Sequence, residues 1–435
     1  MLRTARRIIS ALLLLVPALT ATAQEDNAIN TYSPYTLYGI GDISQPGFTA
    51  SNGMAGTTIG IRNPLSIDYY NPASLSIRDT LSFLFDFGLK QKNTYAKTND
   101  AKTSANNLNL SHISFSFRLA PGAGIVFGLK PYSDVGYDIE QHEADPLLLY
   151  QMGDILYQYK GEGNINELFI GGGLRINKNF SVGANLIYYF GNVSRYHNTL
   201  FTTNKSYSNI YSSRKIKVGQ IGFSTGAQYH GKLKENLNLT IGATFRPKTD
   251  LSPRQEILTI VKPQTDAAPQ DTINHTNGST NDFFTPMEVG FGVSLAKSHR
   301  LTVGIDYVYQ DWTNFNVQGS NSNFTFTADK NQTVRLGIDY VPNYQDIRKV
   351  VNRWNYRAGA YFTSSYMICN GERIKDYGMT FGLGIPITRM GSKLNASIGI
   401  GQRGTTKSGL IKETYITATL GVSIHEIWFR KYKYQ

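Results

Sequence analysis

Cysteine is almost missing from this chain of 435 residues, which contains Cys369 and no other. An intrachain disulfide and a cysteine-rich metal site are therefore excluded. Charged residues make up only 17% of the sequence, less than is usual for a soluble enzyme of this size. Long apolar runs of 18 or more residues are also missing, and the mean hydropathy is -0.28. These two features argue against a helical membrane protein.

The sequence also lacks the patterns that mark catalytic, metal and nucleic-acid sites. Its seven histidines are dispersed, and none has a partner at the spacing of a structural zinc site. No nucleophile motif and no complete dinucleotide fingerprint is present. The net charge of +12 comes from scattered Lys and Arg, which favours solvated loops and a lumen, or contact with anionic lipopolysaccharide, over nucleic acid. We expect no enzyme activity, no cofactor, no metal and no nucleic-acid partner.

The N-terminus has the pattern of a secretory signal peptide. Arg3, Arg6 and Arg7 precede the apolar stretch 8–19, and the small residues 21–23 form a cleavage signal before Gln24. No cysteine follows this signal, so a lipid anchor is excluded. We expect residues 1–23 to be removed during export.

Apolar and polar residues alternate repeatedly from Leu81 onward, which is typical of strands that separate two environments. Leu81, Phe83, Phe85 and Phe87 share one face, and Ile113, Phe115 and Phe117 repeat the pattern. Twelve further segments follow it: 123–133, 155–176, 180–193, 215–230, 236–246, 286–296, 301–311, 333–341, 354–362, 377–386, 394–403 and 414–424. Strands of about 9–11 residues cross a bilayer at a tilt. The pattern predicts an all-β fold, a transmembrane antiparallel β-barrel of about 14 strands.

The connections alternate in length, as they do in outer-membrane barrels, whose periplasmic turns are short and whose external loops are long. The long polar connections are 93–108, 134–154, 194–214, 248–285, 312–332 and 363–376. The connection 342–353 is the exception, because its position predicts a short periplasmic turn. A soluble β-sandwich is the rival fold. Glycines on the polar strand faces favour the barrel, because a plug in the lumen would explain why small residues are needed there.

Residues 24–79 do not resemble barrel wall. Their dense glycines and prolines interrupt regular structure, yet they are too apolar for a disordered linker. We expect this segment to be an N-terminal hatch, or plug, inside a barrel formed by residues 80–429, with a basic tail at 430–435. The last strand ends with Trp428 and Phe429, which resembles the signal that the barrel-assembly machinery reads during insertion.

Several short motifs resemble the long-chain fatty acid transport porins (FadL type). Met54-Ala55-Gly56 and Asn71-Pro72-Ala73 look like the start of that family, and residues 334–342 and 356–359 look like its later strands. The resemblance covers nearly the whole mature chain. It implies fourteen strands, an N-terminal hatch, and diffusion of hydrophobic molecules past the hatch and out through a gap in the wall.

The resemblance and the composition of the hatch together suggest candidate sites. Apolar residues with a few polar anchors are typical of ligand pockets, so the candidate ligand contacts are Phe48, Met54, Tyr69, Tyr70, Asn71, Pro72, Ala73 and Leu75. The alternative is that these side chains only seat the hatch. The run Gly171, Gly172 and Gly173 is either closely packed strand or a kink where the wall opens.

Two functions from different classes remain open. The first is a channel for passive uptake of hydrophobic small molecules, such as long-chain fatty acids or aromatic hydrocarbons, across the outer membrane. The second is a non-enzymatic barrel subunit of an outer-membrane secretion or assembly complex. The expected partners are outer-membrane lipid and lipopolysaccharide, a hydrophobic ligand, the barrel-assembly machinery, and other envelope proteins.

Overall fold

The computed structural model describes residues 31–79, 81–99, 101–264, 269–279, 283–298, 300–315, 325–388 and 391–427. The predicted signal peptide with its cleavage site before Gln24 lies outside the described residues. So do the terminal aromatics Trp428 and Phe429 and the basic tail.

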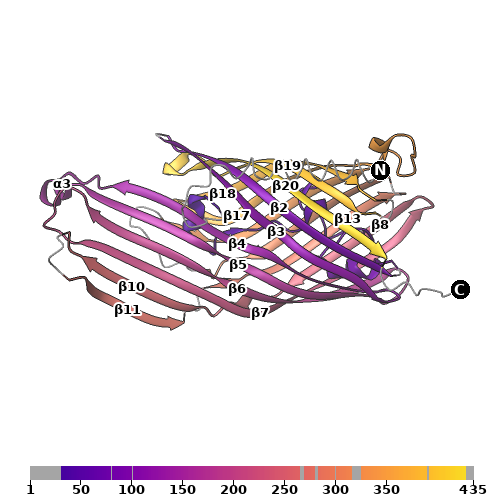
Figure 1. The fold of residues 1–435 in the computed structure, drawn as a ribbon, viewed down its shortest axis with the longest axis horizontal. Helices are drawn as coiled ribbons and strands as arrows, with labels where there is room; N and C mark the ends of the chain where they lie inside the picture. The colour runs from indigo at the N-terminus through magenta and orange to yellow at the C-terminus, as the bar shows by residue number, and fades with distance from the viewer. Residues whose placement is uncertain are drawn as a thin grey trace.

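Fourteen antiparallel strands form a closed wall, as the alternation predicts (Figure 1). Every strand pairs with its neighbour along the chain, and the first strand pairs with the last from Ser82↔Ile427 to Lys97↔Lys412. β3 and β4 pair only from Ile113↔Leu129 to Ala120↔Ala123, so residues 102–112 of β3 and 130–142 of β4 are not paired with each other. The wall strands are β2 (Ser82–Lys97), β3 (Lys102–Ala120), β4 (Ala123–His142), β5 (Ile155–Arg175), β6 (Phe180–Phe201), β7 (Asn209–Lys234), β8 (Leu237–Arg246), β13 (Met287–Lys297), β14 (Leu301–Asp311), β16 (Lys330–Tyr340), β17 (Asn355–Cys369), β18 (Glu372–Pro386), β19 (Lys393–Arg403) and β20 (Lys412–Ile427).

The two faces of the wall carry different side chains. On β6, Leu186 and Tyr188 point outward with exposed fractions of 53% and 43%, whereas Ile187 and Tyr189 point inward and are fully buried. Exposed large apolar side chains recur on the outer faces of the other strands. An outer apolar surface of this extent requires a lipid environment.

The strands from β4 to β7 extend beyond the other wall strands at one end of the barrel (Figure 1). β5, β6 and β7 have 21, 22 and 26 residues, more than a bilayer requires. Two further strands, β10 (Arg254–Lys262) and β11 (Asp271–Ser279), widen this sheet beside β7. Most residues of the loops predicted at 194–214 and 248–285 are therefore strand, whereas in 134–154 only residues 134–142 are strand. Strands outside lipid need no apolar face, so the alternation that identifies strands is missing there.

Residues 31–79 contain only short elements. These are η1 (Pro34–Leu37), β1 (Asp42–Ile43), α2 (Thr49–Asn52) and η2 (Pro72–Ile77). β1 pairs with β4 through Asp42↔Asp134 and Ile43↔Ser133, along the edge of β4 that β3 leaves unpaired. The remaining elements belong to the connections: α3 (Pro146–Met152), β9 (Thr249–Asp250), β12 (Phe284–Thr285), β15 (Phe326–Ala328), η3 (Val350–Arg353) and η4 (Lys407–Gly409). In the described part of the chain, no helix has the length and apolar character needed to cross a membrane.

The long connection 342–353 lies at the end of the barrel that carries the short turns. Val341 donates its backbone N–H to the carbonyl of Arg300, in the turn before β14. The Asp346 carboxylate accepts backbone N–H groups from Lys349 and Arg348 and an amide from Asn352, at 2.9, 2.8 and 2.6 Å. These bonds, led by the one from Lys349, hold the pKa of Asp346 below its usual value. The connection is thus long but folded.

Candidate functional site: the segment inside the barrel

The N-terminal segment lies against the inner faces of strands on all sides of the barrel. A Cβ added at Gly242 on β8 would lie 2.0 Å from the carbonyl oxygen of Ile59, and one at Gly359 on β17 would lie 2.4 Å from Met54. Similar contacts join the segment to Gly183, Gly292, Gly304, Gly337, Gly382 and Gly421. Gly384 differs, because the nearest atoms belong to Arg357 and Asn355. At these glycines, Gly384 excepted, the N-terminal segment approaches the wall backbone closely.

The turn around Ile59 is held through its backbone by wall side chains. Asp306 on β14 accepts the N–H groups of Thr58 and Ile59 at 2.6 and 2.9 Å. Ser294 on β13 donates to the carbonyl of Gly60 at 2.6 Å, and Gln228 on β7 donates to that of Ile59 at 3.0 Å. A buried carboxylate bonded to two N–H groups fixes a turn strongly, because leaving these donors unpaired is costly.

Asn71 and Pro72 build the next turn. The Asn71 side chain caps η2 by accepting the N–H of Ala73 at 3.2 Å, and it donates to the Ile59 carbonyl at 2.8 Å. Pro72 occupies the first position of η2, where its missing N–H has no consequence. Both residues are buried, and Pro72 contacts Gly173 and Gly183. The Asn-Pro-Ala motif thus joins two parts of the segment and seats them on β5 and β6.

A buried cluster of rings forms the next contact between segment and wall. Phe48 stacks on His112 of β3 with ring centres 4.0 Å apart, and Tyr69 packs on Phe169 of β5 at 4.2 Å. Phe48 and Tyr69 also face each other at 6.1 Å. His112 bonds to Asp86 on β2 at 3.1 Å, so the cluster connects β2, β3 and β5.

Charged groups surround the Tyr69 hydroxyl. It donates to Glu167 on β5 and accepts from Arg246 on β8 at 2.9 Å. Arg246 also pairs with Glu167 at 3.0 Å, and Lys130 on β4 lies 3.6 Å from the same carboxylate. Glu167 is fully buried. Separating such a buried pair costs about 3–5 kcal/mol, because it leaves an uncompensated charge.

A small cavity of about 130 Å³ lies beside this network. Most of its lining residues are polar or charged, and they include Tyr70, Arg246, Glu288, Arg335 and Asp376. Tyr70 donates to Glu288 at 2.8 Å. Among the described residues, Arg335 has a buried Nη1 atom with no hydrogen-bond partner. This cavity admits a few water molecules or one small group.

The structure separates the predicted ligand contacts into four groups. Phe48 and Tyr69 meet in the ring cluster, and Tyr70 faces the cavity. Met54 lies elsewhere, against Gly337 and Gly359. Asn71, Pro72, Ala73 and Leu75 sit on the side of β4, β5 and β6, and all four are buried. Direct ligand contact by these residues stays a prediction.

The glycine run on β5 belongs to a regular part of the wall. Gly171, Gly172 and Gly173 pair in register with β4 on one side and with β6 on the other, without a shift. A Cβ at Gly173 would lie 2.2 Å from the Pro72 carbonyl oxygen. Close packing against the segment therefore accounts for Gly173. The strand pairing shows no break at these three glycines of the kind that a kinked opening in the wall would produce.

Sequence reasoning missed the ion pairs that tie the segment to the wall. Asp42 pairs with Lys92 on β2 at 2.8 Å and with Arg403 on β19 at 2.9 Å. Ser33 donates to Glu413 on β20 at 2.6 Å. Lysines and arginines at inward positions of a strand are a signal for such pairs, but their partners are distant in sequence. Groups of three or more potential metal ligands do not occur among the described residues.

A closed fourteen-stranded barrel whose N-terminal segment contacts the inner faces of its strands defines the fold of a plugged outer-membrane β-barrel. The toluene transporter TbuX of Ralstonia pickettii has this fold, with a TM-score of 0.60 at 13% identity, over 87% of this chain and 98% of TbuX. A FadL homologue of Pseudomonas aeruginosa gives 0.57 at 13%, over 89% and 100%. The toluene transporter TodX of Pseudomonas putida gives 0.57 at 15%, over 90% and 100%.

The family itself follows from the sequence. The family model described as BamG matches residues 4–435, so the chain belongs to the BamG family. A comparison with curated proteins gave no match. The resemblance to FadL-type porins is therefore confirmed for the fold, while the matching family has a different name.

Proposed function

We propose that this chain is a non-enzymatic barrel subunit of a complex that assembles proteins in the outer membrane. The observation that carries the proposal is the bonded network between residues 31–79 and the wall. It joins the segment to β14 through Asp306, to β5 and β8 through Tyr69, and to β2 and β19 through Asp42. The name of the BamG family, which points to barrel assembly, supports the same function.

The energetics of the lumen favour a static segment. A path along the barrel axis would require the segment to leave several of these contacts at once, and their free energies accumulate where they are independent. The Tyr69 network alone includes a buried ion pair worth about 3–5 kcal/mol when it is broken. A rigid, filled barrel suits a scaffold whose outer surfaces contact partners.

The test combines partner capture with depletion. We expect the affinity-tagged chain, purified from detergent-solubilised envelopes, to retain other envelope proteins, while an unrelated tagged barrel does not. Depletion of the chain should lower the amounts of other folded outer-membrane barrels, measured by heat-modifiability gels and quantitative proteomics. Capture of no envelope protein, together with unchanged barrel levels, contradicts the proposal.

A second function is supported by the fold, which the chain shares with the toluene transporters TbuX and TodX. It is passive uptake of hydrophobic small molecules such as long-chain fatty acids or aromatic hydrocarbons. Uptake of labelled oleate and toluene by cells with and without the gene tests it directly. Uptake that depends on the gene, with barrel levels unchanged, favours the channel over the assembly subunit.

A further inference from the structure

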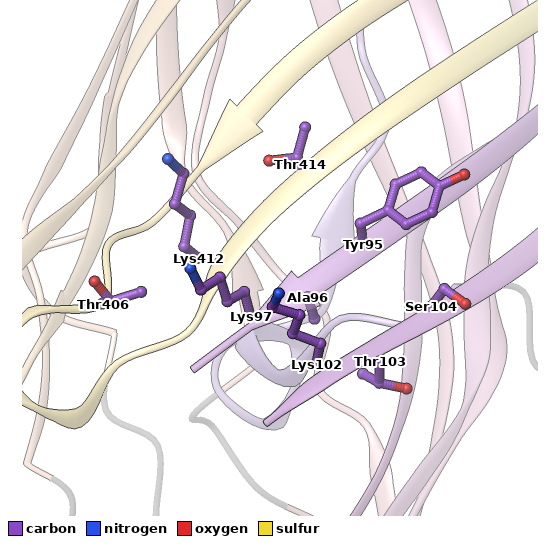
Figure 2. Close-up of a pocket in the computed structure, with 9 residues that line it drawn as sticks. All are labelled: Tyr95, Ala96, Lys97, Lys102, Thr103, Ser104, Thr406, Lys412 and Thr414. Carbon is purple, nitrogen blue, oxygen red and sulfur yellow. The ribbon is translucent and has the colours of Figure 1, made fainter. Parts of the chain in front are cut away.

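Three lysines lie side by side on neighbouring strands at the long-loop end of the barrel. Lys97 on β2 pairs in register with Lys412 on β20 and with Lys102 on β3. Figure 2 shows the three side chains together at the strand ends, with Thr406 across from them. They line an open cleft of about 610 Å³, together with Tyr95, Ala96, Thr103, Ser104 and Thr414.

The positive charge of this lysine cleft has no carboxylate partner in the described part of the chain, where no ion pair involves Lys97, Lys102 or Lys412. The neighbouring carboxylate of Glu413 is buried and accepts a hydrogen bond from Ser33. Like charges directly opposite each other across strands are destabilising. An anion with several oxygens, placed between the three ammonium groups, would offset this repulsion.

The cleft lies on the same outer face as the lipid-facing surface of these strands, nearer to the long-loop end. Alternation places the lysines on the outer face, because Ala96 and Glu413 between them are buried. The next row on this face is Thr414, Tyr95 and Ser104. Two mixed rows follow on this face, first Ile416, Asn93 and Asn106, and then Ala418, Gln91 and Leu108. Beyond them lie the apolar rows Leu420, Leu89 and Leu110, and then Val422, Phe87 and Ile113.

This order matches that of an anionic glycolipid, whose charged groups lie above its acyl chains. Tyrosine is favoured where apolar and aqueous regions meet, and lysines beyond it are attracted to anionic head groups. In the outer leaflet of an outer membrane, the phosphorylated lipid is lipopolysaccharide. The lysine cleft therefore combines the charge, the opening and the position that its phosphate groups require.

We propose that the lysine cleft binds a phosphate group of lipopolysaccharide in the outer leaflet. The site is outside the lumen and shares no residue with the network described above. It is therefore independent of whether the barrel serves in assembly or in uptake.

The test is binding of purified lipopolysaccharide to the full-length barrel in detergent, followed by native mass spectrometry. The cleft variant is K97Q/K102Q/K412Q. Its matched control, K232Q/K234Q/K297Q, removes the same charge from exposed lysines at the short-turn end. We expect the cleft variant to lose affinity by at least about tenfold, because each lysine adds attraction to an anionic lipid surface. The control should bind like the unchanged protein.

Further binding measurements test whether the phosphate of lipopolysaccharide is the group that the cleft binds. Dephosphorylated lipopolysaccharide should bind the unchanged barrel as weakly as intact lipopolysaccharide binds the cleft variant. K97R/K102R/K412R, which keeps the charge, should retain binding, and heat-modifiability gels should show every variant folded. Equal loss in both glutamine variants, or full binding of the dephosphorylated lipid, overturns the proposal. Saturation by inorganic phosphate, with lipopolysaccharide failing to compete, also overturns it, because the site would then select a free anion.

Discussion

At the scale of single residues, the wall glycines determine how closely the N-terminal segment approaches the sheet. A glycine normally weakens a strand, so each one needs a compensating contact. Gly242 has such a contact with Ile59, whereas Gly278 on β11 has no atom within 4 Å of an added Cβ. The two positions are a matched pair of strand glycines in the same protein.

We predict that Gly242→Ala destabilises the barrel or displaces the segment, while Gly278→Ala is neutral or slightly stabilising. The added methyl group at Gly242 would overlap the Ile59 carbonyl oxygen, and overpacking of this kind costs about 1–3 kcal/mol. Heat-modifiability midpoints of the two variants test this. Equal midpoints would show that residues 58–60 are not held against β8.

Asp306 provides a second test at the scale of one residue. Replacing it with Ala leaves the N–H groups of Thr58 and Ile59 without their acceptor, at a cost of about 1–3 kcal/mol for an unpaired buried group. We expect Asp306→Ala to keep a folded barrel but to raise its conductance in planar bilayers. The control is Asp271→Ala, an exposed carboxylate on β11. An unchanged conductance in the Asp306 variant would mean that this turn does not hold the segment in place.

At the scale of elements, the sequence predicts the bounds of the strands well only for the parts that face lipid. The alternation in β8, β13 and β14 reproduces their bounds within a residue or two, because one face must be apolar. The prediction fails at the end of β6 and the start of β7, because residues 194–201 and 209–214 show no regular alternation of buried and exposed positions. The segment 31–79 was recognisable by its apolar, turn-rich composition. Its partners were not, because Asp42–Arg403 and Ser33–Glu413 join residues separated by most of the chain.

β7 offers a test of where lipid ends along one strand. Its outer face carries Phe223, which is 50% exposed, and further along it carries Lys217 and Lys215. An Arg facing lipid at mid-membrane costs about 2–4 kcal/mol, and the cost falls toward the interface. We expect Phe223→Arg to reduce the folded barrel in heat-modifiability gels, and Ser213→Arg, on the same face of the extension, to leave it unchanged. Equal effects of the two substitutions would mean either that the extension around Ser213 lies in lipid or that the part of β7 around Phe223 lies outside lipid.

At the scale of the whole molecule, the question is whether the segment inside the barrel moves during function. A Cβ at Gly304 would lie 3.1 Å from Cγ2 of Thr57. Because Sγ of a cysteine at position 57 could take the place of this Cγ2 atom, cysteines at 57 and 304 are close enough to form a disulfide. We therefore propose a lock, T57C/G304C, made in a C369S background because Cys369 is the single native cysteine. The oxidised lock fixes the segment to β14, and a reductant releases it.

If the chain is an assembly subunit with a static segment, oxidised and reduced forms should support the same levels of other folded outer-membrane barrels. If a hydrophobic ligand passes the segment, oxidation should abolish uptake of oleate or toluene, and reduction should restore it. Loss of barrel assembly on oxidation alone would contradict the static scaffold, because the segment would then have to move for assembly as well.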